Sequence, residues 1–512
     1  MHLLRLRNLA LPCLLLLLCL SLNRSLPLAA QEQAAGTPSI TKRSDDEKRT
    51  YRAAMEQADQ KIADEVKAHS ELMKNLEYLT TQIGARLTGS PQMNRASQWA
   101  VERFKDYGID AHLETTEIPH SWTRGDDTAE IIAPVKKAIE IRSAGWSKAT
   151  PGAVTGNVLF LSSPSEMEKH KGKLKGAILL MRQPTELPSD TEVPNNAYDA
   201  VIPPSHGLPR AGGRARFQER QRMIKAAADE GAAIVLQDSG KPAGLFNMTS
   251  FSKYDPSQIP VAFLTHEDYS LIYRLLQAGP VAMKLNLTGT FSSGPAKTSI
   301  TVAEIKGNEQ ADERVMIGGH LDSWDLGQGA VDNGTGAMAV LEAARSLHAL
   351  GWKPRRTITF ILFTGEEEGG IGAELFVKNH EAEIPKMDAM LVHDLGTGRV
   401  FTIVLEDQFE TASLMEEIYR PVAELFNLDP LDTRYYGSSD HVEFLNRGVP
   451  AYFCLQKPDH YREAHHSQAD TFDKVIADDV NQGAAVLASW AWNVSEMPQA
   501  LPHHAAKEER EE

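Results

Sequence analysis

The chain has 512 residues, enough for two or three domains, and 42% of them are hydrophobic, as in an ordinary folded protein. Its formal net charge is −16. This charge argues against nucleic acid and anionic membrane surfaces as partners, because both are negatively charged themselves.

The first thirty residues have the pattern of a secretory signal peptide. Two arginines precede an apolar run at residues 9–22, and Pro-Leu-Ala-Ala at 27–30 supplies small residues for cleavage near residue 30. The run is shorter than the ~20 residues of a membrane-spanning helix, which makes an uncleaved anchor the minor alternative. We therefore expect a secreted or periplasmic protein with no membrane attachment after cleavage. Cys454 is then the only cysteine, which excludes an internal disulfide.

The pattern of predicted helices and strands changes twice along the remaining chain. Residues 45–122 combine a charged helix, an amphipathic helix and a strand, whereas residues 123–294 consist mainly of short strands and turns. Strands and helices alternate regularly from residue 295 to residue 500, and residues 501–512 form a polar tail that we expect to be disordered.

Alternation of strands and helices predicts an α/β fold with a mostly parallel central sheet flanked by helices. Residues 45–122 contain too few elements to enclose a core of their own. We therefore predict that they join residues 295–500 in one catalytic domain, and that residues 123–294 form an inserted β-rich domain.

A glycine-rich loop, Gly318–Gly336, contains the first candidate site. It follows the buried strand pattern of residues 315–317 and precedes a predicted helix at 338–347. Open α/β sheets place their sites at such carboxyl ends of strands. The loop carries His320, Asp322 and Asp332, a combination typical of metal binding. A solvated turn whose acids cap the next helix is the alternative for this loop alone.

Three later loops repeat this chemistry, each after a predicted strand. Glu366 and Glu367 lie in the first, Asp394 in the second, and His466 with Asp470 in the third. If these loops meet at one sheet edge, several carboxylates share a partly buried cleft and repel one another. Two divalent cations would remove this repulsion, and a mixed set of imidazoles and carboxylates suits zinc.

The residues of these motifs and their order along the chain resemble those of a known family. HLD at 320–322, DNG at 332–334, GEE at 365–367, HDLG at 393–396 and H-x-x-x-D at 466–470 are similar to the motifs of the co-catalytic zinc exopeptidases. This family includes secreted bacterial aminopeptidases, and the resemblance is strongest to its carboxypeptidase Q-like branch, through GHLDSWDLGQGAVD at 319–332 and HHSQADT at 465–471. The inserted region resembles a protease-associated domain in its texture and placement.

The resemblance implies a role for each residue. Two Zn²⁺ ions would share Asp332, with His320 and Asp394 completing one site and Glu367 and His466 the other. Glu366 would be the general base, and Tyr436 would bind the oxyanion. Two further acids would orient the histidine ligands from behind: Asp322 behind His320, and Asp470 near His466.

The implied activity is that of an exported di-zinc exopeptidase acting on terminal bonds of short peptides or dipeptides. A metal-bound hydroxide would attack the carbonyl, with Glu366 moving the proton. Asn333 stands where carboxypeptidase Q proper has a second aspartate, which leaves aminopeptidase, dipeptidase and carboxypeptidase specificity open. A single-zinc glutaminyl cyclase and a non-catalytic receptor-like relative are the alternatives, and a homodimer is compatible with the sequence.

Overall fold

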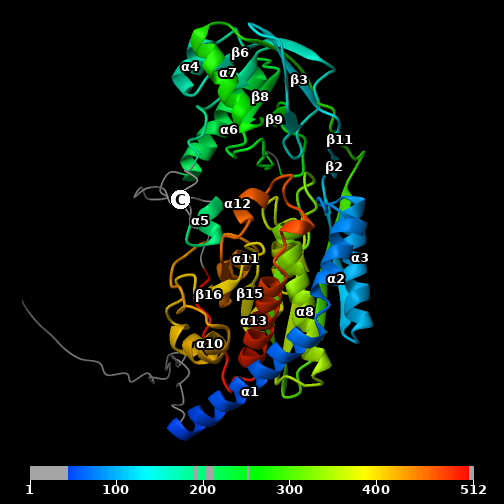
Figure 1. Ribbon diagram of the computed structural model, residues 1–512, viewed down its shortest axis with the longest axis vertical. Helices are drawn as coiled ribbons and strands as arrows, with labels where there is room; N and C mark the ends of the chain where they lie inside the picture. The colour runs from blue at the N-terminus through cyan, green and yellow to red at the C-terminus, as the bar shows by residue number, and fades with distance from the viewer. Residues whose placement is uncertain (1–43, 188–193, 202–212, 251–252, 507–512) are drawn as a thin grey trace, which may run out of the picture. The chain divides into compact units, whose positions relative to one another are not determined.

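The computed structural model describes residues 44–187, 194–201, 213–250 and 253–506 (Figure 1). The predicted signal peptide lies outside these ranges. The chain divides into two units, Met1–Lys48 and Arg49–Glu512, and the fold described here is that of the second.

Within the described residues, seven strands form the first sheet, in the order β1-β12-β14-β13-β15-β17-β16. The four middle strands, from β14 to β17, are parallel, while β1, β12 and β16 pair antiparallel at the two edges. The predicted α/β class with a mostly parallel central sheet is therefore confirmed. The strands are β1 (Asp110–Ile118), β12 (Ala296–Ile305), β13 (Gln310–His320), β14 (Arg356–Phe363), β15 (Met387–Val392), β16 (Val400–Val404) and β17 (Ala451–Gln456).

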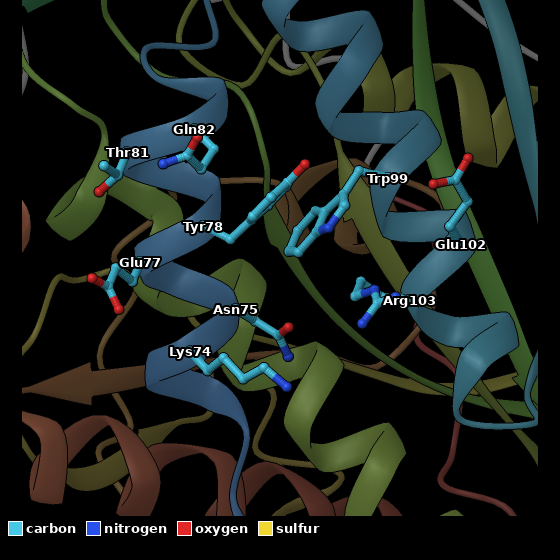
Figure 2. A pocket seen from close by; sticks show the side chains of 9 residues that line it. All are labelled: Lys74, Asn75, Glu77, Tyr78, Thr81, Gln82, Trp99, Glu102 and Arg103. Carbon is cyan, nitrogen blue, oxygen red and sulfur yellow. The ribbon is translucent and has the colours of Figure 1, made fainter.

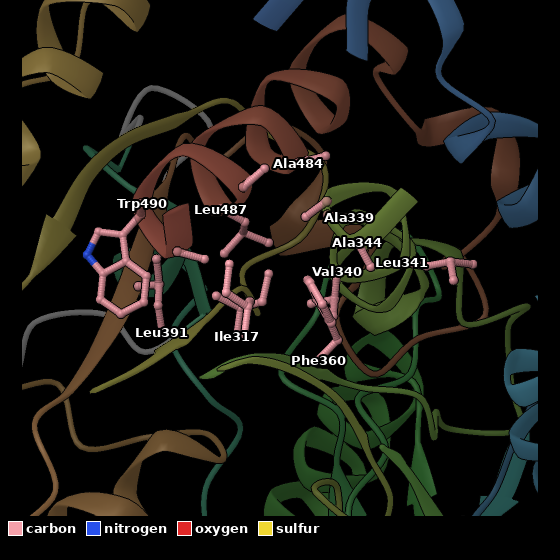
Figure 3. Packing of buried hydrophobic residues seen from close by; sticks show 14 of the residues in the cluster. Ile317, Ala339, Val340, Leu341, Ala344, Phe360, Leu391, Ala484, Leu487 and Trp490 are labelled. Atoms are coloured by element: carbon pink, nitrogen blue, oxygen red, sulfur yellow. The ribbon is translucent and has the colours of Figure 1, made fainter. Parts of the chain in front are cut away.

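Alternate side chains of the strands feed two separate cores, one on each face of this sheet. Val315 and Ile317 of β13 belong to one buried cluster and Met316 to the other, as the period of two along a strand requires. Figure 3 shows Ile317 of the first cluster beside Leu391, Leu487 and Trp490. The first core is covered by α2 (Leu72–Tyr78), α3 (Pro91–Asp106), α8 (Thr335–Ala349), α10 (Ala412–Phe426) and α13 (Ala477–Ser495), and the second by α9 (Ile371–Asn379) and α11 (His441–Asn446).

Helix α8 directly follows the glycine-rich loop and is buried on all sides from Thr335 to Leu347. The sequence shows one apolar face, but α8 contacts α13 and α2 as well as strands β13 and β14, so its polar face is covered too. Its buried Glu342 and Arg345 form an ion pair, in which Arg345 Nη2 donates to Glu342 Oε1 over 2.7 Å. The helix thereby fixes one end of the loop rigidly.

The second sheet contains eight strands within the described residues, in the order β4-β3-β10-β6-β7-β8-β9-β5. Strands β6 to β9 are parallel, so this region is more α/β in character than the β-rich texture suggests. Its domain boundaries at residues 123 and 294 stay predictions. Its strands are β3 (Thr128–Ala133), β4 (Lys137–Ile139), β5 (Ile141–Ser143), β6 (Val154–Phe160), β7 (Ile178–Leu180), β8 (Ile234–Asp238), β9 (Val261–Leu264) and β10 (Ala282–Asn286).

Helices and short elements complete the described chain. Helix α7 and strand β9 were not expected from the sequence; Thr265 caps α7, accepting a hydrogen bond from Asp268 N. The remaining elements are α1 (Asp45–His69), η1 (Leu79–Ile83), β2 (Trp122–Thr123), α4 (Pro164–Lys169), α5 (Ala197–Val201), α6 (Gly213–Asp229), α7 (His266–Ala278), β11 (Thr290–Phe291), η2 (Ala330–Gly334), η3 (Glu381–Lys386), α12 (Tyr461–Ala464) and η4 (Phe472–Lys474).

The expected disordered tail from residue 501 is wrong for residues 501–506. Leu501 is 2% exposed and belongs to the first core. His503 Nε2 lies 2.9 Å from the carbonyl oxygen of Met387, and His504 N donates to Gly448 O. A single apolar side chain and two backbone contacts thus hold a segment whose composition is mostly polar. Across the part of the chain that the structure describes, none of the helices combines the length and apolar character needed to cross a membrane.

Candidate metal centre

The candidate residues lie at the carboxyl edge of the first sheet. Strand β13 ends at His320, which is in register with Phe363 at the end of β14. Gly318 pairs with Val392, the last residue of β15, and Val392 pairs with Phe453 of β17. Parallel strands in register deliver the loops that follow them to the same edge. The four loops identified in the sequence therefore meet there.

Three side chains from two loops form a first cluster. His320 Nε2 lies 3.0 Å from Asp394 Oδ1 and 3.4 Å from Asp332 Oδ1. All three side chains are buried, and their ligand atoms lie within 4.8 Å of one another, close enough to hold one metal ion. The donors are one imidazole nitrogen and two carboxylates, a set that zinc accepts.

A second cluster shares Asp332 with the first. His466 Nε2 lies 2.9 Å from Glu367 Oε2 and 3.7 Å from Asp332 Oδ2. Asp332 therefore lies between the two histidines, with one carboxylate oxygen toward each. Asp332 Oδ2 and Glu367 Oε1 are buried and have no hydrogen-bond partner among the described residues. His465 stacks on His466, and ligand atoms of His465, His466 and Asp332 lie within 4.8 Å of one another, so His465 is a further imidazole near the same site.

Buried charge at this edge is strongly unbalanced. Burial raises the pKa of Glu367 well above its ordinary value, and the neighbouring Asp332 carboxylate adds to the effect. Burial alone would lower the pKa of His320, but the carboxylates around it raise that pKa well above the ordinary value. Carboxylates thus outnumber the cations available to neutralise them. Two divalent cations fit this donor set, because they would supply the missing positive charge and use the unpartnered oxygens.

A cavity of about 310 Å³ opens onto both clusters. Glu366 lies on its wall, half-buried, and its main-chain N–H donates to Asp322 Oδ1 over 3.4 Å. Burial raises the pKa of Glu366 to about 8, a shift that His320 opposes and Asp394 reinforces. The described lining residues are Tyr198, Val201, Asp332, Glu366, Glu367, Gly369, Asp394, Leu395, Ser438, Ser439, Tyr461, His465 and His466.

Asp322 holds two of the loops together. Its carboxylate is fully buried and accepts from the main-chain N–H groups of Glu366 and Glu367 and from the hydroxyl of Thr88. Its Oδ1 lies 3.6 Å from His320 Nδ1, and its own carbonyl oxygen lies closer, at 3.1 Å. Asp322 therefore positions the Glu366–Glu367 turn as well as the imidazole that the sequence pointed to.

Asp470 also supports the site, although at a different point from the one expected. Its Oδ1 accepts from Val331 N over 2.6 Å and its Oδ2 from Asp332 N over 3.2 Å. The expected contact with His466 is not among the interactions of the described residues. Asp470 thus fixes the backbone of Asp332, the residue shared by the two clusters.

Arg86 is a central residue of the site that the sequence did not single out. Its guanidinium is completely buried and donates to four carbonyl oxygens, those of Gly84, Leu321, Gln328 and Gly329. Burial lowers its pKa to about 10, and the charges of Asp470 and Asp322 oppose that shift. Arg86 therefore both ties down the glycine-rich loop and supplies one positive charge beneath it. Its only sequence signal is an arginine in a short loop between apolar residues and glycines.

Two more carboxylates, those of Glu368 and Asp440, are buried beside the clusters. Burial is the first cause that raises the pKa of each well above its ordinary value, followed by the charge of Asp322 for Glu368 and of Glu366 for Asp440. They add to the negative charge that the site must neutralise.

Asn333 has a structural role that explains why an amide stands there. Its Nδ2 donates to His393 O over 2.9 Å, and its Oδ1 accepts from Gly336 N over 2.9 Å. An ionised aspartate has no donor for the His393 carbonyl. The amide thus links the end of β15 to the start of α8.

Tyr436 does not line the cavity in its described part. Its hydroxyl lies 3.2 Å from Asp432 Oδ2, and its ring packs edge-on against Tyr198, which does line the cavity. The oxyanion role of Tyr436 stays a prediction. Tyr461 is the second tyrosine on the cavity wall, and the sequence did not point to it.

A larger cavity, of about 500 Å³, lies elsewhere, between α2, η1 and α3 (Figure 2). Tyr78 and Trp99 stack within it at a centroid distance of 5.3 Å. Its lining contains no histidine, and its charged side chains include cations as well as acids. Size alone would select this cavity, but the chemistry selects the smaller one.

Comparison with known proteins bears on this arrangement directly. Residues 301–491 match peptidase family M28, and this span contains every residue of the two clusters. This part of the chain is a peptidase family M28 domain. It is a metallopeptidase.

Among M28-related proteins, carboxypeptidase Q of Mus musculus is 29% identical over 439 residues, covering 84% of this chain and 86% of the relative. Carboxypeptidase Q of Homo sapiens is 29% identical and covers 85% of this chain and 88% of its own. The crystal structure of a peptidase M28 precursor from Shewanella amazonensis superimposes with a TM-score of 0.74 at 27% identity, covering 88% of this chain and 99% of that one. A zinc aminopeptidase from Bacillus subtilis shares the fold, with a TM-score of 0.62 at 18% identity and coverage of 84% and 96%.

Proposed function

We propose that this M28 metallopeptidase is an exported di-zinc exopeptidase that removes terminal residues from short peptides or dipeptides. The observation that supports it most is the position of Asp332. Its two carboxylate oxygens face different histidines, His320 at 3.4 Å and His466 at 3.7 Å. A carboxylate placed between two such donor sets is suited to bridge two cations.

The proposed ligands divide into two sets around this carboxylate. His320 and Asp394 would hold one zinc, Glu367 and His466 the other, and Asp332 both. When bound, the two ions would polarise the scissile carbonyl and lower the pKa of a water molecule. This division of ligands also agrees with the similarity in fold to a zinc aminopeptidase from Bacillus subtilis.

The side chains of the chain then have separate tasks. Glu366 lies on the cavity wall beside the two clusters and is not needed as a ligand, so it is placed to take a proton from water and return it to the leaving amine. Asp322 fixes the turn that carries Glu366, and Asp470 fixes the backbone of Asp332. Tyr436 remains our candidate for the hydrogen-bond donor to the oxyanion. In this role its hydroxyl would leave Asp432 and donate to the substrate.

Replacement of the proposed base tests this division. Glu366→Gln keeps the shape of the side chain and removes its basicity, so we expect unchanged zinc content and a loss of about 10²–10⁴-fold in kcat. Glu374→Gln, on the exposed side of α9 just beyond the same turn, serves as the matched control and should leave both quantities unchanged. A Glu366→Gln enzyme with wild-type turnover would refute the assignment.

A comparison of blocked and free substrates determines whether the enzyme cleaves at the amino or the carboxyl terminus of a peptide. Dipeptides with a free amine and a blocked carboxyl group, and the reverse, separate an aminopeptidase from a carboxypeptidase. Hydrolysis of free dipeptides alone would identify a dipeptidase.

A further inference from the structure

A loop between β8 and β9, residues 239–248, contacts the chain that carries His466. Lys241 Nζ donates to Arg462 O over 2.8 Å and to Glu463 O over 3.4 Å, and also bonds the carbonyl of His465. The lysine is only 7% exposed. These carbonyls belong to the end of helix α12, whose last turn leaves them without helical partners and favours a positive charge.

The same loop also binds residues on the far side of His466. Met248 N donates to His466 O over 2.8 Å. Phe246 N donates to Gln468 Oε1 over 2.9 Å, and Gln468 Nε2 donates to Gly244 O over 3.0 Å. Residues 465–468 are therefore held on both sides by one segment that belongs to the second sheet.

The backbone of His466 requires such support. Its φ is 58°, in the left-handed region that residues with a Cβ rarely adopt. A non-glycine residue persists there only when its surroundings fix it. The carbonyls of His465 and His466 are the groups that Lys241 and Met248 bind, so these contacts determine where the imidazole of His466 points.

We propose that residues 239–248 form a positioning element for the metal site that contains His466, with Lys241 as its principal positioning residue. The inference rests on the proposed function, because it assumes that His466 and Glu367 bind zinc. It adds that the region of the second sheet supports the metal centre by donating hydrogen bonds to the backbone carbonyls of residues 462–466, without supplying a metal ligand. It also predicts that the two zinc sites depend unequally on this loop, since none of the hydrogen bonds made by its described residues involves His320 or Asp394.

The test compares zinc affinity at the two sites separately. His320→Ala leaves mainly the Glu367–His466 site, and His466→Ala leaves mainly the His320–Asp394 site. Lys241→Met keeps the length of the side chain and removes its donors. In the His320→Ala background we expect Lys241→Met to raise the zinc Kd by about 10–100-fold, as loss of groups behind a metal ligand does. In the His466→Ala background the Kd should change less than about twofold. Competition with a chromogenic chelator measures both.

Two further variants make the result decisive. Gln468→Leu removes the contacts with Gly244 and Phe246 and should weaken the same site in the same direction, even if Lys241→Met fails to fold. Lys148→Met, an exposed lysine of the same region whose Nζ binds Gln258 O, should change neither site.

Two zinc sites with unchanged affinity in the folded Lys241→Met and Gln468→Leu proteins would overturn the inference alone. Equal weakening of both sites would overturn it too, because a general structural role would act on both. A wild-type chain that binds no zinc would overturn the proposed function, and this inference with it.

Discussion

Arg86→Met is the substitution that the buried network makes most informative. Methionine occupies a similar volume but cannot donate, so the carbonyls of Gly84, Leu321, Gln328 and Gly329 lose their partner. The change also removes a buried positive charge that interacts with Asp470, Asp322, Asp332 and Glu367.

The expected loss of stability follows from these two effects. A hydrogen bond that involves a charged group contributes about 1.5–3 kcal/mol net, but part of the four contacts is regained from water that enters the space. Removal of one member of a buried charge network costs about 3–5 kcal/mol because opposite charges remain uncompensated. The effects overlap, since the same guanidinium makes both. We therefore expect the free energy of unfolding to fall by about 3–5 kcal/mol.

Urea unfolding, followed by tryptophan fluorescence in the presence of a chelator, measures this loss in the metal-free protein. Arg95→Met is the matched control, because Arg95 also donates to a carbonyl, that of Gln82, but from an exposed position. It should change stability by less than about 0.5 kcal/mol. A loss below about 1 kcal/mol in Arg86→Met would show that the buried guanidinium does not hold the loop.

Two further predictions concern the stability of the fold and involve residues that are not proposed as metal ligands. Burial raises the pKa of Asp59 to about 7, above the ordinary value of about 4, so the folded state is favoured while Asp59 is protonated and that stability is lost as pH rises toward and through 7. As pH rises from about 4 to 8, the free energy of unfolding of Asp59→Asn should therefore increase relative to that of the wild type, by up to roughly 4 kcal/mol in urea unfolding. The control Asp64→Asn, at an exposed position, should show no such increase. A difference between Asp59→Asn and the wild type that does not change with pH would contradict this. Gly336→Ala would place a Cβ 2.2 Å from His393 O and should cost about 1–3 kcal/mol by the same assay, while Gly294→Ala, with open space around it, should be neutral; an equally stable Gly336→Ala would refute the tight contact.

Much of the fold and of the site could be predicted because the signals are local. Strand patterns followed by loops rich in acids and imidazoles predict where each loop leaves the sheet, and parallel pairing then brings His320, Asp394 and Glu367 to one edge. The pattern did not reveal that α8 is buried all round, because burial depends on α2 and α13, which pack against it from distant parts of the sequence.

The supporting residues were harder to predict, since their partners are backbone atoms far away in the sequence. Arg86 and Lys241 bind carbonyl oxygens more than two hundred residues away. Every residue has a backbone carbonyl, so the sequence does not indicate which carbonyls are bound. The H-x-x-x-D motif at 466–470 implied that Asp470 supports His466, but its carboxylate accepts from the backbone of Asp332. The burial of Leu501 likewise depends on a core built by other segments.

The central claim is that Asp332 lies between two zinc ions. Anomalous diffraction at the zinc edge, from crystals of protein purified without chelators, tests it most directly. We predict two peaks per chain, one beside His320, Asp332 and Asp394, and the other beside Asp332, Glu367 and His466. A single peak would favour a one-zinc acyl transferase such as a glutaminyl cyclase, and the absence of any peak in contact with Asp332 would contradict the account.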